Sequence, residues 1–136
     1  MARRLGAQNN KFELQDNLSD STIVLFYRMP TTEEIAAYSN GMVQRKGNKL
    51  KRQVGEMRQK YGALILTGVG PQSFEKKAGD KWLPVISDPA AKDFDKDWKS
   101  HVAAQAPDII EALAIHVFET SVQLAEPDDE EDAAKN

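Results

Sequence analysis

Cysteine is absent from the 136 residues of this chain. Its absence excludes disulfides, thiolate nucleophiles and cysteine-ligated zinc or iron–sulfur sites, and it fits a reducing compartment. Histidine is scarce, since only His101 and His116 occur, and no serine lies in a nucleophile elbow of the G-x-S-x-G type. With so few reactive groups, the sequence predicts a protein that is not an enzyme.

Long apolar runs are missing as well. No stretch of 18 apolar residues occurs, so we expect no transmembrane span and no membrane partner. The first ten residues contain Arg3 and Arg4 but no apolar core, which argues against a secretory signal. Hydrophobic residues make up 40% of the chain and charged residues 29%, a mixture typical of one globular domain. We therefore expect a cytoplasmic protein.

Charge is unevenly distributed along the chain, although the net charge is only −3. The segment 126–136 carries six acidic residues against the single cation Lys135. Such a segment cannot build a core, so we expect an acidic disordered tail at 126–136. It could shield a basic segment of the chain or recruit a basic partner. Residues 1–10 are expected to form a flexible arm, and residues 11–125 a single globular helix-rich domain.

The N-terminal part of this domain has a clear β signal. Residues 21–28 are rich in β-branched and aromatic side chains, and residues 11–14 could pair with them as a hairpin, because turn-forming residues lie between. Met29 precedes Pro30 and is therefore biased towards extended backbone. Thr31 and Glu34 have the spacing of a capping box. We expect a helix at about 32–39 that ends at Asn40-Gly41.

Two apolar stripes with helical spacing follow. The first predicts a helix over 43–64 that terminates at Gly68 and Gly70, and the second predicts a helix that restarts at Pro107. The side chains that we expect to share one core come from both stripes: Val54, Met57, Tyr61, Ile109, Leu113 and Val117. The fold class predicted is α+β, a mostly helical single domain with a small N-terminal β element.

The segment between the stripes is less regular. Residues 74–76 and 81–83 could form a small hairpin. Asp88-Pro89 is typical of a helix start, and the short helix that we expect there would carry Phe94, Trp98 and Val102 on one face.

Three motifs invite a chemical interpretation, but each lacks required parts. His116 and Glu119 lie one helical turn apart, a spacing that can bind metal, yet no further ligands accompany them. Aspartates at 93, 95 and 97 alternate as in a calcium loop, without its glycine and distal glutamate. Gly68-Val-Gly-Pro lacks the length and the lysine of a phosphate-binding loop. We expect no metal and no cofactor.

The strongest remaining signal is a basic cluster. Seven cations fall between Arg45 and Lys60 and are opposed only by Glu56. The cluster could be a solvated helix face, a contact for an acidic protein surface, or a contact for nucleic-acid phosphates. Only Tyr38 and Tyr61 flank it, so no base-stacking platform is indicated. The candidate partner-binding residues are Arg45, Lys49, Arg52, Arg58 and Lys60.

Several short segments resemble tail assembly chaperones of tailed phages and prophages. They are Phe26-Tyr-Arg-Met-Pro-Thr-Thr-Glu-Glu-Ile35, Tyr61-Gly-Ala-Leu-Ile-Leu-Thr-Gly68, Asp97-Trp-Lys99 and Ala106-Pro-Asp-Ile-Ile-Glu-Ala-Leu113. The resemblance implies a non-enzymatic role in tail assembly within the bacterial host cell, by binding phage tail proteins such as the tape-measure protein or tail-tube subunits. It carries over no site residue. The alternative is an accessory nucleic-acid-binding protein that uses the basic residues 45–60.

Overall fold

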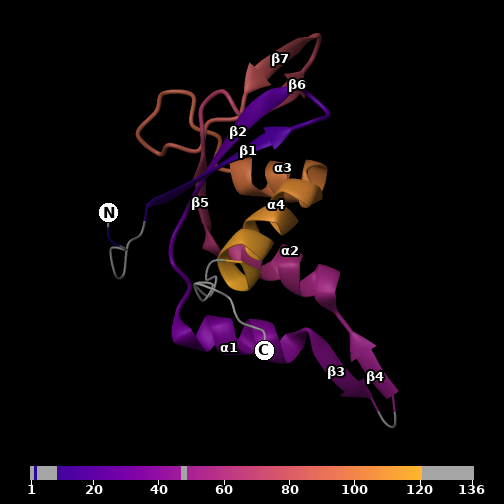
Figure 1. The fold of residues 1–136 in the computed structure, drawn as a ribbon. Helices are drawn as coiled ribbons and strands as arrows, with labels where there is room; N and C mark the ends of the chain where they lie inside the picture. Colours follow the sequence, from indigo (N-terminus) through magenta and orange to yellow (C-terminus); the bar gives the residue numbers. More distant parts are fainter. Residues whose placement is uncertain (1, 3–8, 47–48, 121–136) are drawn as a thin grey trace, which may run out of the picture.

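The computed structural model describes residues 2, 9–46 and 49–120, with residues 43–46 and 49–52 described by their backbone (Figure 1). The chain begins with an antiparallel hairpin of β1 (Asn10–Asp16) and β2 (Ser21–Tyr27), which confirms the expected pairing. Within its turn, the Asp16 carboxylate accepts hydrogen bonds from the Leu18 amide at 3.1 Å and the Ser19 hydroxyl at 2.6 Å. A third strand, β5 (Leu66–Val69), pairs antiparallel with the other side of β2.

Two serine side chains continue the hydrogen bonding of this sheet. The Ser87 hydroxyl accepts from the Val69 amide at 2.9 Å and lies 3.2 Å from the Val69 carbonyl, to which it can donate. The Ser73 hydroxyl accepts from the Val24 amide at 2.9 Å, beyond the point where β5 ends. Backbone groups at the margin of the sheet therefore find partners without a further strand.

The first helix, α1 (Thr32–Gly41), starts at the capping box that the sequence predicts. The Thr31 hydroxyl accepts from the Glu34 amide at 3.1 Å, and the Glu34 carboxylate accepts from the Thr31 amide at 2.9 Å. Arg28 donates to both oxygens of the same carboxylate at 2.8 and 2.7 Å. This ion pair fixes the angle at which the chain leaves β2 and enters α1.

The helix expected over 43–64 is wrong in its first half. Residues 43–52 contain β3 (Val43–Lys46) and β4 (Lys49–Arg52), which pair antiparallel, with Val43 opposite Arg52 and Lys46 opposite Lys49. The sequence between them is Gly-Asn, which favours a hairpin connection and disfavours a helix, where glycine costs about 1 kcal/mol relative to alanine. The helix α2 spans only Val54–Ile65.

The glycines at 68 and 70 do not terminate this helix. Strand β5 starts at Leu66, directly after the last residue of α2, and includes Gly68. The aliphatic run from Leu64 to Leu66 thus contains both the end of α2 and the start of β5. Hydrophobic periodicity alone cannot locate the boundary between a helix and a strand within such a run.

The expected fold class is wrong in its balance of elements. In the described part of the chain, the strands form three separate sheets: β1-β2-β5, β3-β4 and β6-β7. β structure is therefore spread along the chain and is not a small N-terminal addition to a mostly helical domain. The architecture is a mixed α+β fold.

The C-terminal half matches the expectations more closely. Strands β6 (Glu75–Ala78) and β7 (Lys81–Pro84) form the expected small hairpin. The expected helix start at Asp88-Pro89 is wrong, because Asp88 forms a turn with Ala91 there. Helix α3 (Trp98–Gln105) starts nine residues after Pro89, so Phe94 lies before the helix and not on its face. Helix α4 (Pro107–Ala114) begins at the predicted proline and continues into a π-helical turn, η1 (Ile115–Glu119).

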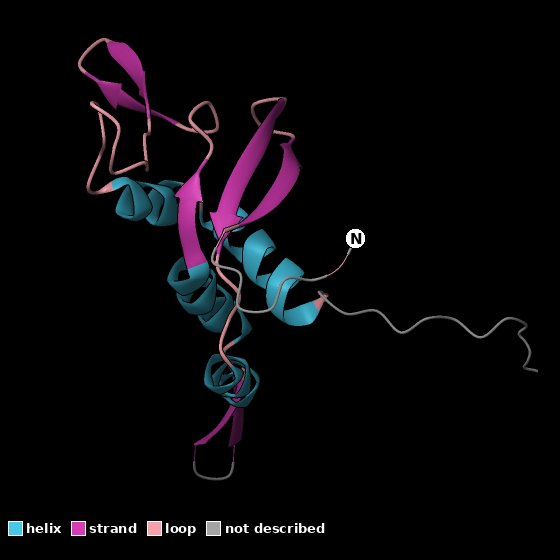
Figure 2. Ribbon diagram, turned by 90° about the vertical axis from the view of Figure 1, so that its left-hand side faces the viewer, coloured by secondary structure: helices cyan, strands magenta, loops and turns pink. Residues whose placement is uncertain are grey.

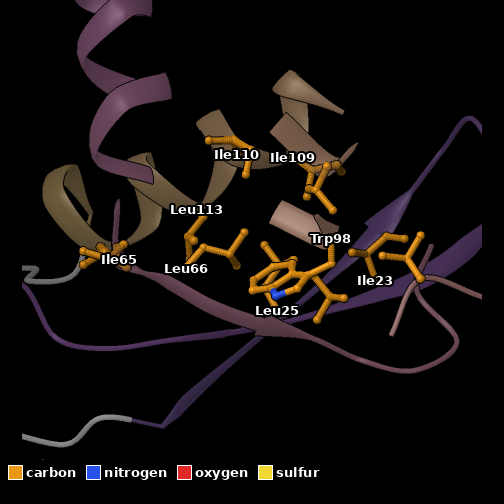
Figure 3. Close-up of a cluster of buried hydrophobic side chains, with 12 residues drawn as sticks. Ile23, Leu25, Ile65, Leu66, Trp98, Ile109, Ile110 and Leu113 are labelled. Carbon is orange, nitrogen blue, oxygen red and sulfur yellow. The ribbon is translucent and has the colours of Figure 1, made fainter. Parts of the chain in front are cut away.

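The main core lies between the three-stranded sheet and the helices. Figure 3 shows the Trp98 side chain of α3 among residues from β2, α2, β5 and α4. Ile109, Leu113 and Val117 belong to this core, as expected. Tyr61 instead belongs to a second cluster with Tyr38 and Ala114, with Met57 packed against it, and Val54 is only partly buried. The single shared core that the stripes predict is therefore divided in two.

The close crossing of α2 and α4 depends on a glycine. A Cβ atom at Gly62 would lie 2.5 Å from the carbonyl oxygen of Ile110 and 2.8 Å from its Cγ2 atom. Both distances are shorter than van der Waals contact. The missing side chain lets the two helix backbones approach each other.

Candidate partner-binding surface

Arg58 is a structural residue in this fold. Its Nε and Nη2 atoms donate to the two carboxylate oxygens of Glu119, each at 2.8 Å, and the hydroxyl of Tyr38 donates to the same carboxylate. Hydrogen bonding from Arg58 lowers the pKa of Glu119, whereas burial followed by the hydrogen bond to Glu119 raises the pKa of Tyr38. The three side chains tie α1, α2 and η1 together.

An aromatic cluster lies directly beneath this ion pair. Tyr38 stacks on Phe118 with ring centroids 4.3 Å apart, and Tyr61 meets both rings edge-on at 5.8 and 5.9 Å. Arg58 is therefore committed to holding a folded cluster, and reversing its charge would disturb the fold as well as any partner contact.

Lys60 remains on the surface of α2. Its Nζ atom lies 5.4 Å from the centroid of the Tyr61 ring. It lines a shallow hollow of about 620 Å³ between α2 and α4, together with Gln59 and Glu111. The Gln59 amide donates across this hollow to the Pro107 carbonyl at 2.6 Å. The structure describes the side chains of two predicted site residues, Arg58 and Lys60. Of these two, Lys60 makes no ion pair within the described residues, whereas Arg58 does.

The other three predicted residues lie on the β3-β4 hairpin. Arg45 is on β3, and Lys49 and Arg52 are on β4. Five of the eight strand residues in this hairpin are basic, and we call residues 43–52 the basic hairpin. In Figures 1 and 2 it projects from the end of the molecule formed by α1 and α2. The predicted site is therefore divided between the basic hairpin, a packed ion pair and the surface of α2.

A second projecting feature is the β6-β7 hairpin, none of whose residues is among the predicted partner-binding residues. All four residues of β7 are exposed, and Trp82 and Leu83 are exposed to 62% and 44%. Figure 2 shows this hairpin at the opposite end of the molecule from the basic hairpin. Tryptophan is one of the residue types enriched among the energetic anchors of protein interfaces, so Trp82 is a candidate contact.

The β6-β7 hairpin is held to the body by polar contacts. Lys76 of β6 lies 2.5 Å from the Asp95 carboxylate, which also lies 3.2 Å from Nε2 of His101 on α3. The Val85 amide donates to the Phe74 carbonyl at 2.8 Å at the base of the hairpin. These contacts position Trp82 without burying it.

The central members of the two candidate metal motifs have structural partners. His116 stacks on Phe12 with ring centroids 4.2 Å apart, while Glu119 is held by Arg58. Asp95 is occupied by Lys76, His101 and the amide of Asp97. Among residues 2, 9–46 and 49–120, no group of three or more histidine or carboxylate side chains is arranged to hold a metal ion.

Comparison with known proteins adds no relative, because no family model, curated protein or solved structure matches the chain. In the described part of the chain, no helix has the length and apolar character required to span a membrane. The surfaces of the chain itself are therefore the guide to its function.

Proposed function

We propose that the chain is a non-enzymatic protein that assists phage tail assembly in the cytoplasm of a bacterial host, by binding a partner such as the tape-measure protein or a tail-tube subunit. The resemblance of residues 26–35, 61–68, 97–99 and 106–113 to tail assembly chaperones suggests this class. The observation that carries the proposal is the exposure of Trp82 on a strand that buries none of its residues.

Trp82 has the properties of an interface anchor. Tryptophan supplies a large contact area and is enriched at the energetic centre of protein interfaces. Lys77 lies opposite Trp82 in the hairpin, and Lys81 precedes it. An apolar helical stripe bordered by acidic residues would cover the indole and meet these two cations. Long apolar helical surfaces of this kind are what a tail assembly chaperone would have to protect.

Co-expression with the tape-measure and tail-tube proteins of the same gene cluster tests the proposal. Trp82→Lys should reduce recovery of the partner at least tenfold in affinity purification, because interface anchors typically contribute 2 kcal/mol or more. Leu64→Lys is the matched control, since Leu64 is also a large exposed apolar residue, but on α2. Equal recovery with both variants would contradict the proposal.

A second candidate function is nucleic-acid binding, and the geometry of the basic hairpin favours it. The cations at 45, 49 and 52 lie on a projecting antiparallel ribbon. A two-stranded ribbon fits the major groove of B-DNA, and lysine and arginine neutralise its phosphates.

The two candidates are separated by one charge-reversal variant, Arg45→Glu with Lys49→Glu and Arg52→Glu. Arg58 is left unchanged, because it holds Glu119. Binding of a mixed-sequence DNA duplex, measured by fluorescence anisotropy between 50 and 200 mM salt, should be weak and unaffected by the variant if the partner is a protein. Tight, salt-dependent binding that the variant abolishes would favour the nucleic-acid function instead.

A further inference from the structure

A pocket of about 600 Å³ lies beside the outer edge of β5, and neither the basic hairpin nor the β6-β7 hairpin contributes a described residue to its lining. One wall is formed by Phe26 of β2 and Thr67 of β5, and the other by the segment 86–93. Its apolar lining includes Pro71, Ile86 and Pro89. Its size is within the range of pockets that hold ligands of about drug size.

Hydrogen bonds fix the second wall. The Ser87 hydroxyl is bound to the backbone of Val69, and the Ile86 carbonyl accepts from the Asp95 amide at 2.9 Å. The Asp88 carboxylate accepts from the Ala90 amide at 2.9 Å. The pocket is therefore preformed, which reduces the ordering cost when a ligand binds.

Among the described residues, the charged side chains that line the pocket have one sign. Asp88 and Asp93 both line it, and no described lysine, arginine or histidine does. Asp93 makes no hydrogen bond or ion pair within the described residues, so its charge is available to a ligand. Phe26 adds an aromatic ring, which attracts a cation placed over its face. Two carboxylates, an aromatic ring and apolar walls suit a cation on an apolar stem.

We propose that this pocket binds an arginine or lysine side chain of a protein partner, with an apolar neighbour of that residue against Pro71 and Ile86. This inference rests on the proposed function, because it takes the molecule that fills the pocket to be a protein. The pocket is partly open to solvent, which leaves room for one side chain of a polypeptide to enter while the rest of the polypeptide stays outside. A small metabolite would bury most of its surface, which an open pocket does not provide.

The proposal is tested with the peptide acetyl-Ser-Leu-Arg-Leu-Ser-amide and the full chain labelled with ¹⁵N. Titration should shift the amide signals of Thr67, Ala91 and Asp93, and the resulting Kd should rise at least fivefold when citrulline replaces arginine. Asp88→Asn combined with Asp93→Asn should weaken binding about tenfold. Asp80→Asn, in the turn between β6 and β7, is the matched control and should leave the Kd unchanged.

Four outcomes would overturn the proposal. Equal binding of the arginine and citrulline peptides would remove the role of charge, and signal shifts confined to other residues would place the contact elsewhere. Equal binding of N-acetyl-arginine methylamide and the peptide would identify a small cation as the ligand. Tighter peptide binding after Arg3→Gln with Arg4→Gln would identify the chain's own arm as the occupant. Because Trp82 lies outside the pocket lining, failure of the Trp82→Lys test leaves this test intact.

Discussion

The guanidinium of Arg58 on α2 contacts both carboxylate oxygens of Glu119 on η1, each at 2.8 Å, although 61 residues separate them in the sequence. About three quarters of each side chain is shielded from solvent. The pair therefore joins α2 to η1 more effectively than an exposed ion pair would.

Replacing Glu119 with glutamine should lower the free energy of unfolding by about 1.5–3 kcal/mol at neutral pH, the usual range for a hydrogen bond to a charged group. In the folded protein the pKa of Glu119 is lower than its ordinary value of 4.5. The contribution of the ionised carboxylate to the free energy of unfolding is therefore complete above pH 4.5 and is lost on acidification. Urea unfolding at pH 7 and pH 3 checks both statements. A difference between wild type and variant that grows on acidification would contradict them.

Alanine substitutions at two glycines of α2 should change the stability of the fold in opposite directions. Gly62→Ala should destabilise the fold by about 1–3 kcal/mol, because the new Cβ atom would overlap the backbone of Ile110. Gly55→Ala meets no atom within 4 Å and should stabilise the helix by about 0.5–1 kcal/mol. Thermal unfolding of both variants, followed by circular dichroism, measures the contrast. Similar melting temperatures would show that α2 and α4 do not cross closely at Gly62.

Leu113 is fully buried in the main core, with 0% exposure. Leu113→Ala should cost about 2–5 kcal/mol, since it removes apolar contacts and leaves a cavity. The matched control is Leu64→Ala, because Leu64 is 44% exposed and should change stability by less than about 0.5 kcal/mol. Chemical denaturation of both variants gives the difference, and a comparable loss in each would place Leu113 outside the core.

Glu34 should also make the fold sensitive to acid. Hydrogen bonding from Arg28 lowers the pKa of Glu34 from 4.5 to about 2. Its contribution is therefore complete above pH 4.5 and is lost as the pH falls towards 2. Glu34→Gln should be less stable than wild type at pH 7 and close to it at pH 2. A constant stability difference across this range would argue against the ion pair.

The acidic segment 126–136 lies outside the described residues, and its expected disorder stays a prediction. Deleting it should change the free energy of unfolding by less than about 0.5 kcal/mol, because it offers no core-forming side chain. Equilibrium unfolding of the shortened chain checks this. A loss of several kcal/mol would show that the segment contributes to the fold.

Local chemical signals in the sequence predicted the elements that depend on them. The capping box of Thr31 and Glu34 marked the start of α1, Pro107 marked the start of α4, and the β-prone run at 21–28 marked β2. The capping box and the proline act through contacts within a few residues, so they mark helix starts without reference to the tertiary fold. The β-prone run marks a strand because its side chains suit a pleated, half-buried surface.

Periodicity was less reliable where two patterns overlap. Val43 and Leu50 fit a helical stripe through their spacing of seven, but Val-Gln-Arg-Lys and Lys-Leu-Lys-Arg are also compatible with paired strands. The prediction of the partner surface contained the same error, because it placed residues 45–60 on one helix face. The roles of Arg58 and Trp82 depend on residues far away in the sequence, such as Glu119, and no local pattern indicates them.

The hydroxyls of Ser73 and Ser87 also limit how the protein can self-associate. A sheet grows when an unpaired edge accepts another strand, but the amide and carbonyl of Val69 at the β5 edge already bind Ser87. At the opposite edge, β1 carries the ion pair of Lys11 and Glu13 at 2.8 Å, and charge of this kind discourages edge-to-edge stacking. Both margins of the sheet therefore carry features that discourage the addition of a further strand.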